Sequence, residues 1–320
     1  EDGEPVTTMD QGVRLARVRS IPNPFWEDGR VPFISQNDLS EIVDDFRPDV
    51  LHCHEAALLG LQLLRVKRET GLPMLATSYH VARFPARYLT WNGEPQEAIE
   101  SLFWTYSTWF LNHADRVVFA TAAHRNAFQE RGLDVPTVLI SNGIDLTRYH
   151  PRTSAKELVQ ERYDLPPGPR ILFVSRLAKD KEIEVLIEAM DHIRLQLPAT
   201  LLIVGDGDHR TRLEDLTGEL GLEDNVRFFG FVPEEDLPLL YNAVDLFAIA
   251  STCEVQSLPT LQAVATGLPV VAANAMALPE LVHPDVNGFL APPSDARAMA
   301  EAVLRILADQ ELAGQMGKAS

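Results

Sequence analysis

The 320-residue sequence has few cysteines, no long apolar run and no excess of basic residues. Its two cysteines, Cys53 and Cys253, lie far apart and cannot form a disulfide framework or a four-cysteine zinc site. No stretch approaches the roughly 18 uninterrupted apolar residues of a membrane-spanning helix. The formal net charge of −18 argues against a broad nucleic-acid-binding or anionic-membrane surface. These absences predict a protein of a reducing compartment, by default the cytoplasm, with no nucleic-acid partner.

Short apolar runs alternate with longer helical patterns along the sequence, which is typical of βαβ units with parallel sheets. At roughly 100 to 200 residues per domain, the length suggests two α/β domains in tandem. The predicted strands are 14–20, 49–53, 73–77, 116–120, 137–140, 170–174, 200–204, 226–229, 246–249 and 269–272. The predicted helices are 38–46, 56–69, 95–113, 122–131, 181–197, 209–220, 235–242, 258–266 and 295–309.

Proline and glycine punctuate the chain between residues 149 and 169, and a new strand starts directly afterwards. We therefore predict a first domain over residues 1–151 and a second over residues 152–320. The charge divides unevenly, because residues 1–150 hold 14 basic and 20 acidic side chains, which leaves 14 and 26 for the rest. The two halves are therefore expected to bind different ligands.

In open α/β sheets, ligands bind at the carboxyl ends of the strands, so the residues that follow each strand are the candidates. Arg176, Lys179 and Lys181 follow the strand 170–174 and precede a helix, which favours binding of an anion such as a diphosphate. A solvated turn is the alternative. Gly205 and Gly207 follow the next strand, where glycine lets the backbone approach a ligand closely.

The loop after the strand 246–249 combines an acid with the start of a helix. Glu254 lies in the loop, Ser257 precedes the helix 258–266, and Pro259 falls in its first turn. The helix amino terminus is a second candidate anion site, and Glu254 would accept hydrogen bonds from a polyol. The alternative is a surface carboxylate followed by a serine N-cap.

Two patterns resemble metal sites, but each also fits a role without a metal. Asp206 and Asp208 could hold a divalent cation, yet this Asp-Gly pattern is also a common turn, and Asp208 could cap the following helix. His52 and His54 flank Cys53 and precede a glutamate at position 55, but alternation along a strand sends the histidines and the cysteine to opposite faces. We therefore predict a structural or acceptor-lining histidine pair and no metal.

The first half carries three further candidate features. His80 follows the strand 73–77 and is a candidate acid, base or hydrogen-bond donor. The helix 56–69 ends in a basic cluster, and residues 103–110 are rich in aromatics, a combination that suits an anionic membrane surface. We favour the alternative of a core-packed helix and a buried aromatic stripe. The basic cluster is Arg65, Lys67 and Arg68.

These strand-end residues, in this order, resemble the retaining nucleotide-sugar glycosyltransferases of glycosyltransferase family 4. That family has the GT-B fold, in which two Rossmann-like domains face each other across a cleft. The resemblance runs through nearly the whole chain. It rests on FVSRL at 173–177 with Lys181, VGDG at 204–207, FGFVP at 229–233, EVQSLPTLQA at 254–263, ATGLPVV at 265–271, ALPE at 277–280, NGF at 287–289 and the linker-like NGID at 142–145.

The resemblance implies transfer of a hexose from a nucleotide sugar of the UDP-glucose or GDP-mannose type to a hydroxyl acceptor, for which a membrane lipid is one candidate. Arg176 and Lys181 resemble the pair that neutralises the departing diphosphate, and Glu254 the acid that contacts the sugar hydroxyls. His80 resembles the acceptor-side histidine. Neither a protein nucleophile nor a metal or other cofactor is implied. The other donor-binding residues are Gly205, Gly207, Phe231, Val232, Val255, Gln256, Ser257, Leu258 and Gln262.

The sequence departs from the family pattern in three places. Gln262 stands where the family typically has a second acid that holds the ribose, and a neutral amide forms weaker hydrogen bonds than a carboxylate. The loop 254–257 reads EVQS in place of the common EGFG, a form similar to that of diacylglycerol glucosyltransferases. Because residues 14–20 already read as a third strand, we expect a fragment that lacks the first two strands and the closing helix.

Two other functions compete with transfer. A catalytically weak or silent nucleotide-sugar-binding module is the alternative, because of Gln262 and the expected truncation. A Rossmann dehydrogenase is disfavoured, because no Gly-x-Gly-x-x-Gly follows the first strand of either half. The predicted location is the cytoplasm, with peripheral contact to the cytoplasmic face of an anionic membrane as an open alternative.

Overall fold

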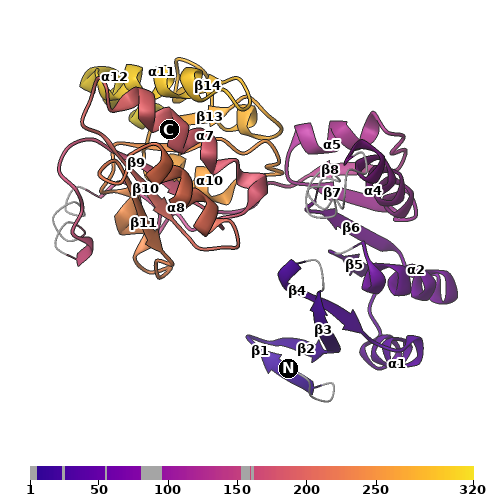
Figure 1. Cartoon of the computed structure of the whole chain (residues 1–320). Coiled ribbons are helices and arrows are strands. Elements are labelled where there is room, and N and C mark those ends of the chain that lie inside the picture. The colour runs from indigo at the N-terminus through magenta and orange to yellow at the C-terminus, as the bar shows by residue number, and fades with distance from the viewer. Residues whose placement is uncertain (1–5, 24–25, 55, 81–95, 153–158, 160–161) are drawn as a thin grey trace. The chain divides into compact units, whose positions relative to one another are not determined.

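A computed structural model describes residues 6–23, 26–54, 56–80, 96–152, 159 and 162–320. The chain divides into two compact units, Glu1–Ser141 and Asn142–Ser320, each containing a parallel sheet (Figure 1). The division lies before the predicted boundary at residue 151, and the intervening segment packs on the second unit. Tyr149 in this segment is 3% exposed, and its ring lies edge-on to Tyr241 at 6.0 Å between centroids. The predicted α/β fold is confirmed.

The second unit is a six-stranded parallel sheet in the order β11-β10-β9-β12-β13-β14. Its central strands are short, mostly apolar runs, as expected for a sheet that is covered on both faces. All residues of β10 and β12 are buried. The strands are β9 Arg170–Val174, β10 Thr200–Val204, β11 Val226–Gly230, β12 Leu246–Ile249, β13 Val270–Ala273 and β14 Gly288–Ala291.

Helices cover both faces of this sheet. Right-handed crossovers that run in opposite directions from β9 place α7 and α8 on one face and α9 and α10 on the other. α11 returns to pack against α7, and α12 follows it. The elements are η1 Lys179–Lys181, α7 Ile183–Ile193, α8 Arg210–Glu219, α9 Leu237–Tyr241, α10 Leu258–Ala265, η2 Leu278–Glu280, α11 Ala296–Leu307 and α12 Gln310–Ala319. Neither β14 nor α12 was predicted from the sequence.

The first unit contains a four-stranded parallel sheet in the sequential order β5-β6-β7-β8. Sequential right-handed crossovers place α2, α4 and α5 on the same face. Lys67 at the end of α2 donates a hydrogen bond to the backbone oxygen of His113, just beyond α4, so these two helices are neighbours. The elements are α1 Gln36–Phe46, β5 Leu51–Cys53, α2 Leu58–Thr70, β6 Met74–Ser78, α4 Gln96–Leu111, β7 Arg116–Phe119, α5 Ala122–Gln129 and β8 Thr137–Leu139.

Residues 14–20 do not form a strand of that parallel sheet, contrary to the prediction. They are shared between β2 Val13–Arg17, which pairs antiparallel with β1 Val6–Asp10, and β3 Arg19–Asn23, which pairs antiparallel with β4 Trp26–Phe33. Gln11 and Gly12 both have positive φ in the turn between β1 and β2, as a two-residue hairpin turn requires. The alternating pattern identified strand structure but not the strand partners.

The described helices are all too short or too polar to cross a lipid bilayer. The longest of them, α4, has 16 residues.

Candidate functional site

The carboxyl edge of the second unit's sheet has one topological switch point. From β9 the chain runs outward through β10 and β11, then returns to β12 on the other side of β9. The segments that follow β9 and β12 therefore diverge, and open α/β sheets bind ligands where this happens. Arg176, Lys181 and Glu254, which the sequence placed after separate strands, all lie in these two segments.

Lys181 is the centre of an ion-pair network at this position. Its ammonium lies 2.8 Å from a carboxylate oxygen of Glu254 and 3.2 Å from one of Asp180. Arg176 lies 3.8 Å from the other oxygen of Asp180. Burial disfavours the ammonium, but the two carboxylates outweigh burial and raise the pKa of Lys181 above its ordinary value. Lys181 is therefore a cation at neutral pH.

Asp180, which is 1% exposed, was not predicted as part of this site. It sits inside η1 between two lysines, and a carboxylate flanked by cations in sequence is normally a solvent-facing residue. The structure turns it inward, under both predicted cations. Buried charges are retained when they are paired, so Asp180 holds Arg176 and Lys181 on one side of the switch point.

Gly205 and Gly207 bring the segment after β10 against the segment after β9. A Cβ on Gly205 would lie 1.9 Å from the backbone oxygen of Ser175, and one on Gly207 would lie 2.3 Å from that of Leu177. Gly205 also has a φ of +127°, a backbone conformation that residues with a Cβ rarely adopt. The close approach that these glycines permit is therefore to the chain's own backbone. Their roles in donor binding stay a prediction.

The segment before α10 is held by hydrogen bonds to the start of the helix and to Asn142. The Ser257 hydroxyl accepts a hydrogen bond from the Thr260 amide at 3.2 Å, so Ser257 is the N-cap of α10. The side-chain oxygen of Gln256 accepts from the Asn142 amide at 2.7 Å. Val255 is half-buried and Leu258 is 44% exposed. The interpretation of Ser257 as an N-cap is confirmed.

Gln262 lies within α10, with its side-chain oxygen 3.0 Å from the Tyr241 hydroxyl that donates to it. Tyr241 is fully buried, and burial raises the pKa of its hydroxyl well above the ordinary value. The hydroxyl therefore stays protonated and a donor. With its oxygen engaged in this way, Gln262 turns its amide nitrogen away from Tyr241. The sequence carried no signal for this partner.

Phe231 and Val232 follow β11 and differ in exposure. Phe231 is 81% exposed, whereas Val232 is 4% exposed and packs in the core. An exposed aromatic face at a strand end can stack on a planar ligand.

One alternative from the sequence was that Asp208 caps α8, and the structure contradicts it. The N-cap of α8 is His209, whose side chain makes no capping hydrogen bond.

Histidines gather at the carboxyl edge of the first unit's sheet. His52 lies in β5 and His54 directly follows it, with their ring centroids 4.0 Å apart, and Tyr79 stacks on His54 at 5.6 Å. Cys53 points into the core at 3% exposure, as strand alternation predicts. A Thr77 hydroxyl lies 2.7 Å from His52. Position 55 lies outside the described residues.

His80 follows β6 and is exposed, although partial desolvation lowers the pKa of its imidazole. Its backbone oxygen accepts a hydrogen bond from Nε2 of His124 at 3.3 Å. His124 is completely buried, and this desolvation lowers the pKa of its imidazole to about 4. It is therefore neutral and must carry its proton on Nε2. A histidine early in a helix gives no sequence signal for such a role.

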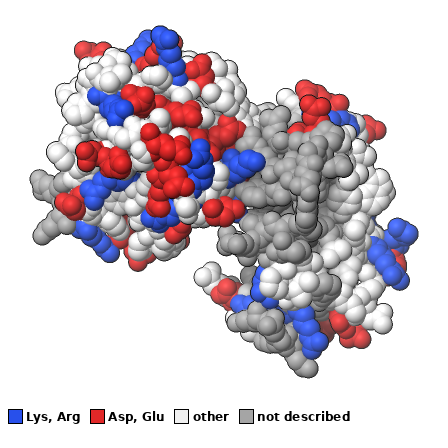
Figure 2. Space-filling model, in the orientation of Figure 1, with Lys and Arg blue, Asp and Glu red and all other residues white. Residues whose placement is uncertain are grey.

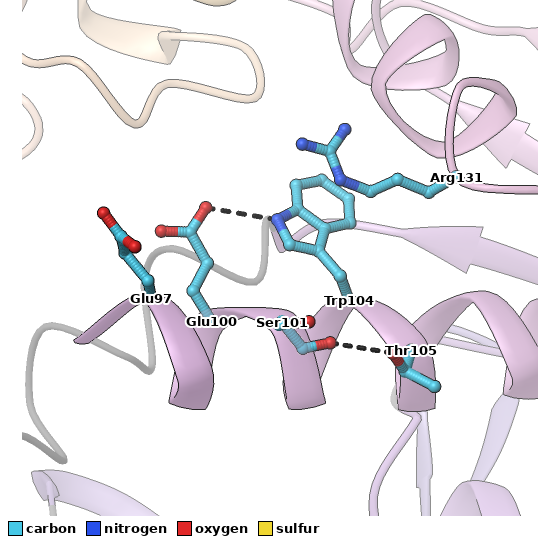
Figure 3. A pocket seen from close by; sticks show the side chains of 6 residues that line it. All are labelled: Glu97, Glu100, Ser101, Trp104, Thr105 and Arg131. Atoms are coloured by element: carbon cyan, nitrogen blue, oxygen red, sulfur yellow. Dashed lines mark hydrogen bonds between the residues drawn. The ribbon is translucent and has the colours of Figure 1, made fainter. Parts of the chain in front are cut away.

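A hollow of about 580 Å³ lies elsewhere in the first unit (Figure 3). Trp104 forms its wall, with the Arg131 guanidinium stacked 4.1 Å from the ring centroid and Glu100 accepting from the indole nitrogen at 3.2 Å. Its described lining contains none of the predicted catalytic or donor-binding residues. In the described residues, the aromatic segment of α4 thus lines this hollow and contributes nothing to the site formed by Arg176, Lys181 and Glu254.

Across the described ranges, no group of three or more His, Cys, Asp or Glu side chains is placed to hold a metal ion. The expectation of a metal-independent reaction stays a prediction. Arg176 and Lys181 place two positive charges beside each other's carboxylate partners at the switch point.

Family models match both halves of the chain. The model described as "Glycosyl transferases group 1" matches residues 157–320, half of the chain, and the model described as "Glycosyltransferase Family 4" matches residues 2–148. The chain belongs to the group 1 glycosyl transferases. The predicted family is confirmed, and the switch-point residues lie in the half that the group 1 model covers.

Two curated relatives of this group 1 chain are a glycosyl transferase and a glycolipid synthase by name. It is 27% identical to the sulfoquinovosyl transferase of Arabidopsis thaliana over 97% of the chain. It is 26% identical to the alpha-monoglucosyldiacylglycerol synthase of Streptococcus pneumoniae over 89% of the chain. The chain spans 59% and 66% of the lengths of these two proteins.

Two solved structures share the fold of this group 1 chain. Sucrose-phosphate synthase from Thermosynechococcus elongatus superposes with a TM-score of 0.81 at 25% identity, covering 99% of the chain and 79% of the synthase. HepE of Anabaena, in complex with UDP and glucose, has a TM-score of 0.76 at 24% identity over 88% of the chain and 75% of HepE. The second likeness shows the fold alone.

Proposed function

We propose that this chain is the nucleotide-sugar-dependent part of a retaining hexosyltransferase. The observation that carries the proposal is the meeting of Arg176, Lys181 and Glu254 at the switch point between β9 and β12. Two cations beside an acid suit a nucleoside diphosphate sugar, whose diphosphate is anionic and whose sugar offers hydroxyl donors. The donor is of the UDP-glucose or GDP-mannose type.

At the anomeric carbon the reaction makes one bond and breaks one. The acceptor hydroxyl oxygen attacks the anomeric carbon of the sugar while the bond from that carbon to the diphosphate oxygen breaks. Negative charge grows on the diphosphate as it leaves, and Arg176 and Lys181 stabilise that charge, since fixed cations act most strongly where charge develops. The acceptor proton passes to a donor phosphate oxygen, so no protein nucleophile is needed. Glu254 orients the sugar through its hydroxyls.

The acceptor belongs to the first unit in this proposal, and a membrane lipid is the class we favour. The name of the streptococcal relative supports a glycolipid product. His80 would lie beside the acceptor hydroxyl, and the cluster of His52, His54 and Tyr79 offers hydrogen-bond donors, acceptors and ring faces. Such a surface suits a polyol or a glycosylated headgroup.

The test measures binding first and transfer second. Thermal unfolding is followed with UDP, GDP, UDP-glucose and GDP-mannose, because a ligand that binds the folded state alone raises the melting temperature. Transfer to diacylglycerol and to glycosyldiacylglycerol in mixed micelles follows with the sugar that binds. We expect Lys181→Ala to lower kcat about 100-fold, and the exposed Lys318→Ala in α12 to leave it unchanged.

The outcomes separate the alternatives. No stabilisation by any of the four ligands contradicts a nucleotide-sugar site. Stabilisation with no transfer or donor hydrolysis contradicts the enzyme and supports a silent binding module. An equal kcat for Lys181→Ala and the unaltered chain contradicts the role of Lys181 in neutralising the leaving group.

A further inference from the structure

Glu182 has an unusual backbone for a residue with a side chain. It joins η1 to α7 with φ 49° and ψ 42°, in the left-handed region. Residues with a Cβ are disfavoured there, and glycine is the usual occupant. Glu182 is the N-cap of α7 but makes no side-chain hydrogen bond to the helix. Capping therefore does not explain why a glutamate occupies this position.

The Glu182 carboxylate joins two other segments of the sheet's carboxyl edge. One oxygen accepts a hydrogen bond from the Thr252 hydroxyl, and the other accepts from the Ser294 hydroxyl at 3.0 Å. Thr252 lies in the segment after β12, and Ser294 in the segment after β14. Ser294 is itself in the left-handed region, with φ 57°. Three segments that follow three strands thus meet on one carboxylate.

These contacts lie directly beside the ion pair of the site. Glu182 follows Lys181 in the chain, and Thr252 precedes Glu254 by two residues. A further hydrogen bond joins the same two segments, since the Ser251 hydroxyl donates to the backbone oxygen of Asp180 at 3.1 Å. The two segments that carry Lys181 and Glu254 are therefore tied by side chains within three residues of each charged residue.

We infer that Glu182 is a positioning residue that clasps the segments after β9, β12 and β14 and so sets the relative placement of Lys181 and Glu254 for the donor. This inference rests on the proposed function. A carboxylate suits the position because it has two oxygens, accepts from two hydroxyls at once, and forms stronger hydrogen bonds with them than a neutral acceptor does. The two hydrogen bonds hold a left-handed backbone that a glutamate would otherwise avoid.

Fixed geometry matters because a misplaced cation stabilises a leaving diphosphate poorly. A displacement of about 1 Å from a change away from the chemistry can cost about 100-fold in rate. The hydrogen bonds of the clasp join Glu182 to Thr252 and Ser294, so their effect on Lys181 and Glu254 passes through the backbone. We expect loss of the clasp to weaken donor affinity about tenfold.

The experiment uses variants that separate the clasp from backbone strain. Glu182→Gly removes the clasp and releases the strain together. Glu182→Gln keeps an acceptor for one hydroxyl and a donor for the other. Thr252→Val and Ser294→Ala each remove one hydroxyl and leave Glu182 in place. The matched control is Asp285→Gly, the same kind of change at another left-handed residue, φ 61°, which precedes β14.

Amide hydrogen exchange and donor affinity are measured for each variant, together with its melting temperature. Amide hydrogen exchange of the ligand-free chain measures protection in residues 250–257 and 292–295, and calorimetry measures affinity for the nucleotide sugar found to bind. For Glu182→Gly we expect faster exchange in both segments and a tenfold higher Kd. Thr252→Val, Ser294→Ala and Glu182→Gln should give the same changes to a smaller degree, and Asp285→Gly should be within twofold of the unaltered chain.

The failures are distinguishable. A lower melting temperature for Glu182→Gly with unchanged donor affinity would mean a purely structural role and would overturn the inference alone. Unchanged affinity in both Thr252→Val and Ser294→Ala would also overturn it, even if Glu182→Gly does not fold. Lack of nucleotide-sugar binding by the unaltered chain overturns the proposed function and, with it, the role given to the clasp.

Discussion

At the scale of single residues, the site is a set of charges and hydrogen bonds whose partners come from distant positions. Lys181 is held by Glu254, 73 positions away, and Gln262 receives its hydrogen bond from Tyr241. Lys181 and Gln262 are both half-buried, and each is hydrogen-bonded to one distant side chain. The chemistry of a position therefore depends on both members of the pair.

Gln262 carries the prediction at this scale. A carboxylate at position 262 could still accept from Tyr241 and would present a second, charged oxygen to a ribose hydroxyl. Charge-assisted hydrogen bonds are roughly twice as strong as neutral ones. We expect Gln262→Glu to lower the donor KM about fivefold, which corresponds to about 1 kcal/mol. Steady-state kinetics with varied nucleotide sugar measure this.

The matched control is Gln129→Glu, the same change at an exposed residue of α5. It should leave the donor KM unchanged. An unchanged or higher KM in Gln262→Glu would show that position 262 does not hold the ribose.

At the scale of single elements, strand ends and helix starts place the functional groups. α5 is an example, because its first turn buries His124 against the rings of Phe119 and Phe128 and lets Nε2 donate to the backbone of His80. Thr121 caps the helix and accepts from the His124 amide at 3.4 Å. The start of α5 thereby supports the segment that carries the predicted acceptor-side histidine.

His124 makes stability depend on pH in a specific window. Its pKa is lowered from about 6.5 in the unfolded chain to about 4 in the fold. The unfolded state therefore binds a proton first as the pH falls below 6.5, and the folded state loses stability until about pH 4. Between pH 7 and pH 5 the loss amounts to about 2 kcal/mol.

The test of this pH dependence compares His124→Gln with the unaltered chain by urea unfolding at pH 7 and pH 5. Glutamine keeps a side-chain N–H donor but does not titrate. The unfolding free energy of His124→Gln should therefore fall less between pH 7 and pH 5 than that of the unaltered chain. Other titrating groups are common to both proteins and cancel in the comparison. The exposed His192→Gln is the control and should match the unaltered chain. Equal pH slopes for all three proteins would contradict a buried, neutral His124.

At the scale of the whole molecule, charge is unevenly distributed. Figure 2 shows acidic side chains spread widely over the described surface of the second unit in this view, with basic ones among them. The first unit has the smaller acidic excess and carries α2, whose outer face is unusual. Leu58 and Leu61 are 47% and 38% exposed, and Arg65 and Arg68 continue the same face at helical spacing.

The structure changes the composition of the predicted basic cluster on α2. Lys67 does not belong to that outer face, because it pairs with Asp115 at 3.1 Å and is 24% exposed. In the aromatic segment of α4, Trp104 and Phe110 are buried, as the core-packing alternative predicted, whereas Trp109 is 46% exposed. The surface that could meet a membrane is thus narrower than the sequence indicated.

Contact of this outer face of α2 with anionic lipid stays a prediction, with the two leucines at the boundary and the two arginines on headgroups. Arg65 is also paired with Glu69 at 2.8 Å. Each arginine near such a surface contributes about 1 kcal/mol. Arg65→Glu with Arg68→Glu should therefore weaken sedimentation with phosphatidylglycerol vesicles at least tenfold at low salt. Arg212→Glu with Arg297→Glu, on exposed positions of the second unit, is the charge-matched control. Equal binding by the two double variants would contradict a membrane face on α2.

Much of the fold followed from local patterns. The strands 170–174, 200–204 and 246–249 were predicted to the residue, because a buried parallel strand is a short, uniformly apolar run between turn signals. β14 was not predicted, because its four residues begin with glycine and give too short a run to separate from a loop. The antiparallel pairs β1-β2 and β3-β4 were not predicted, because pairing depends on partners as well as on alternation.

The sequence by itself determined the α/β class, the family and the strand-end positions of Arg176, Lys181 and Glu254, because these depend on local order along the chain. The tertiary structure alone decided that Asp180 lies under the cations, that Glu182 joins three segments, and that His124 supports His80. It also decided that Gly205 and Gly207 pack against their own chain. These facts depend on contacts between residues far apart in sequence, and no local pattern encodes which distant side chain a buried polar atom will meet.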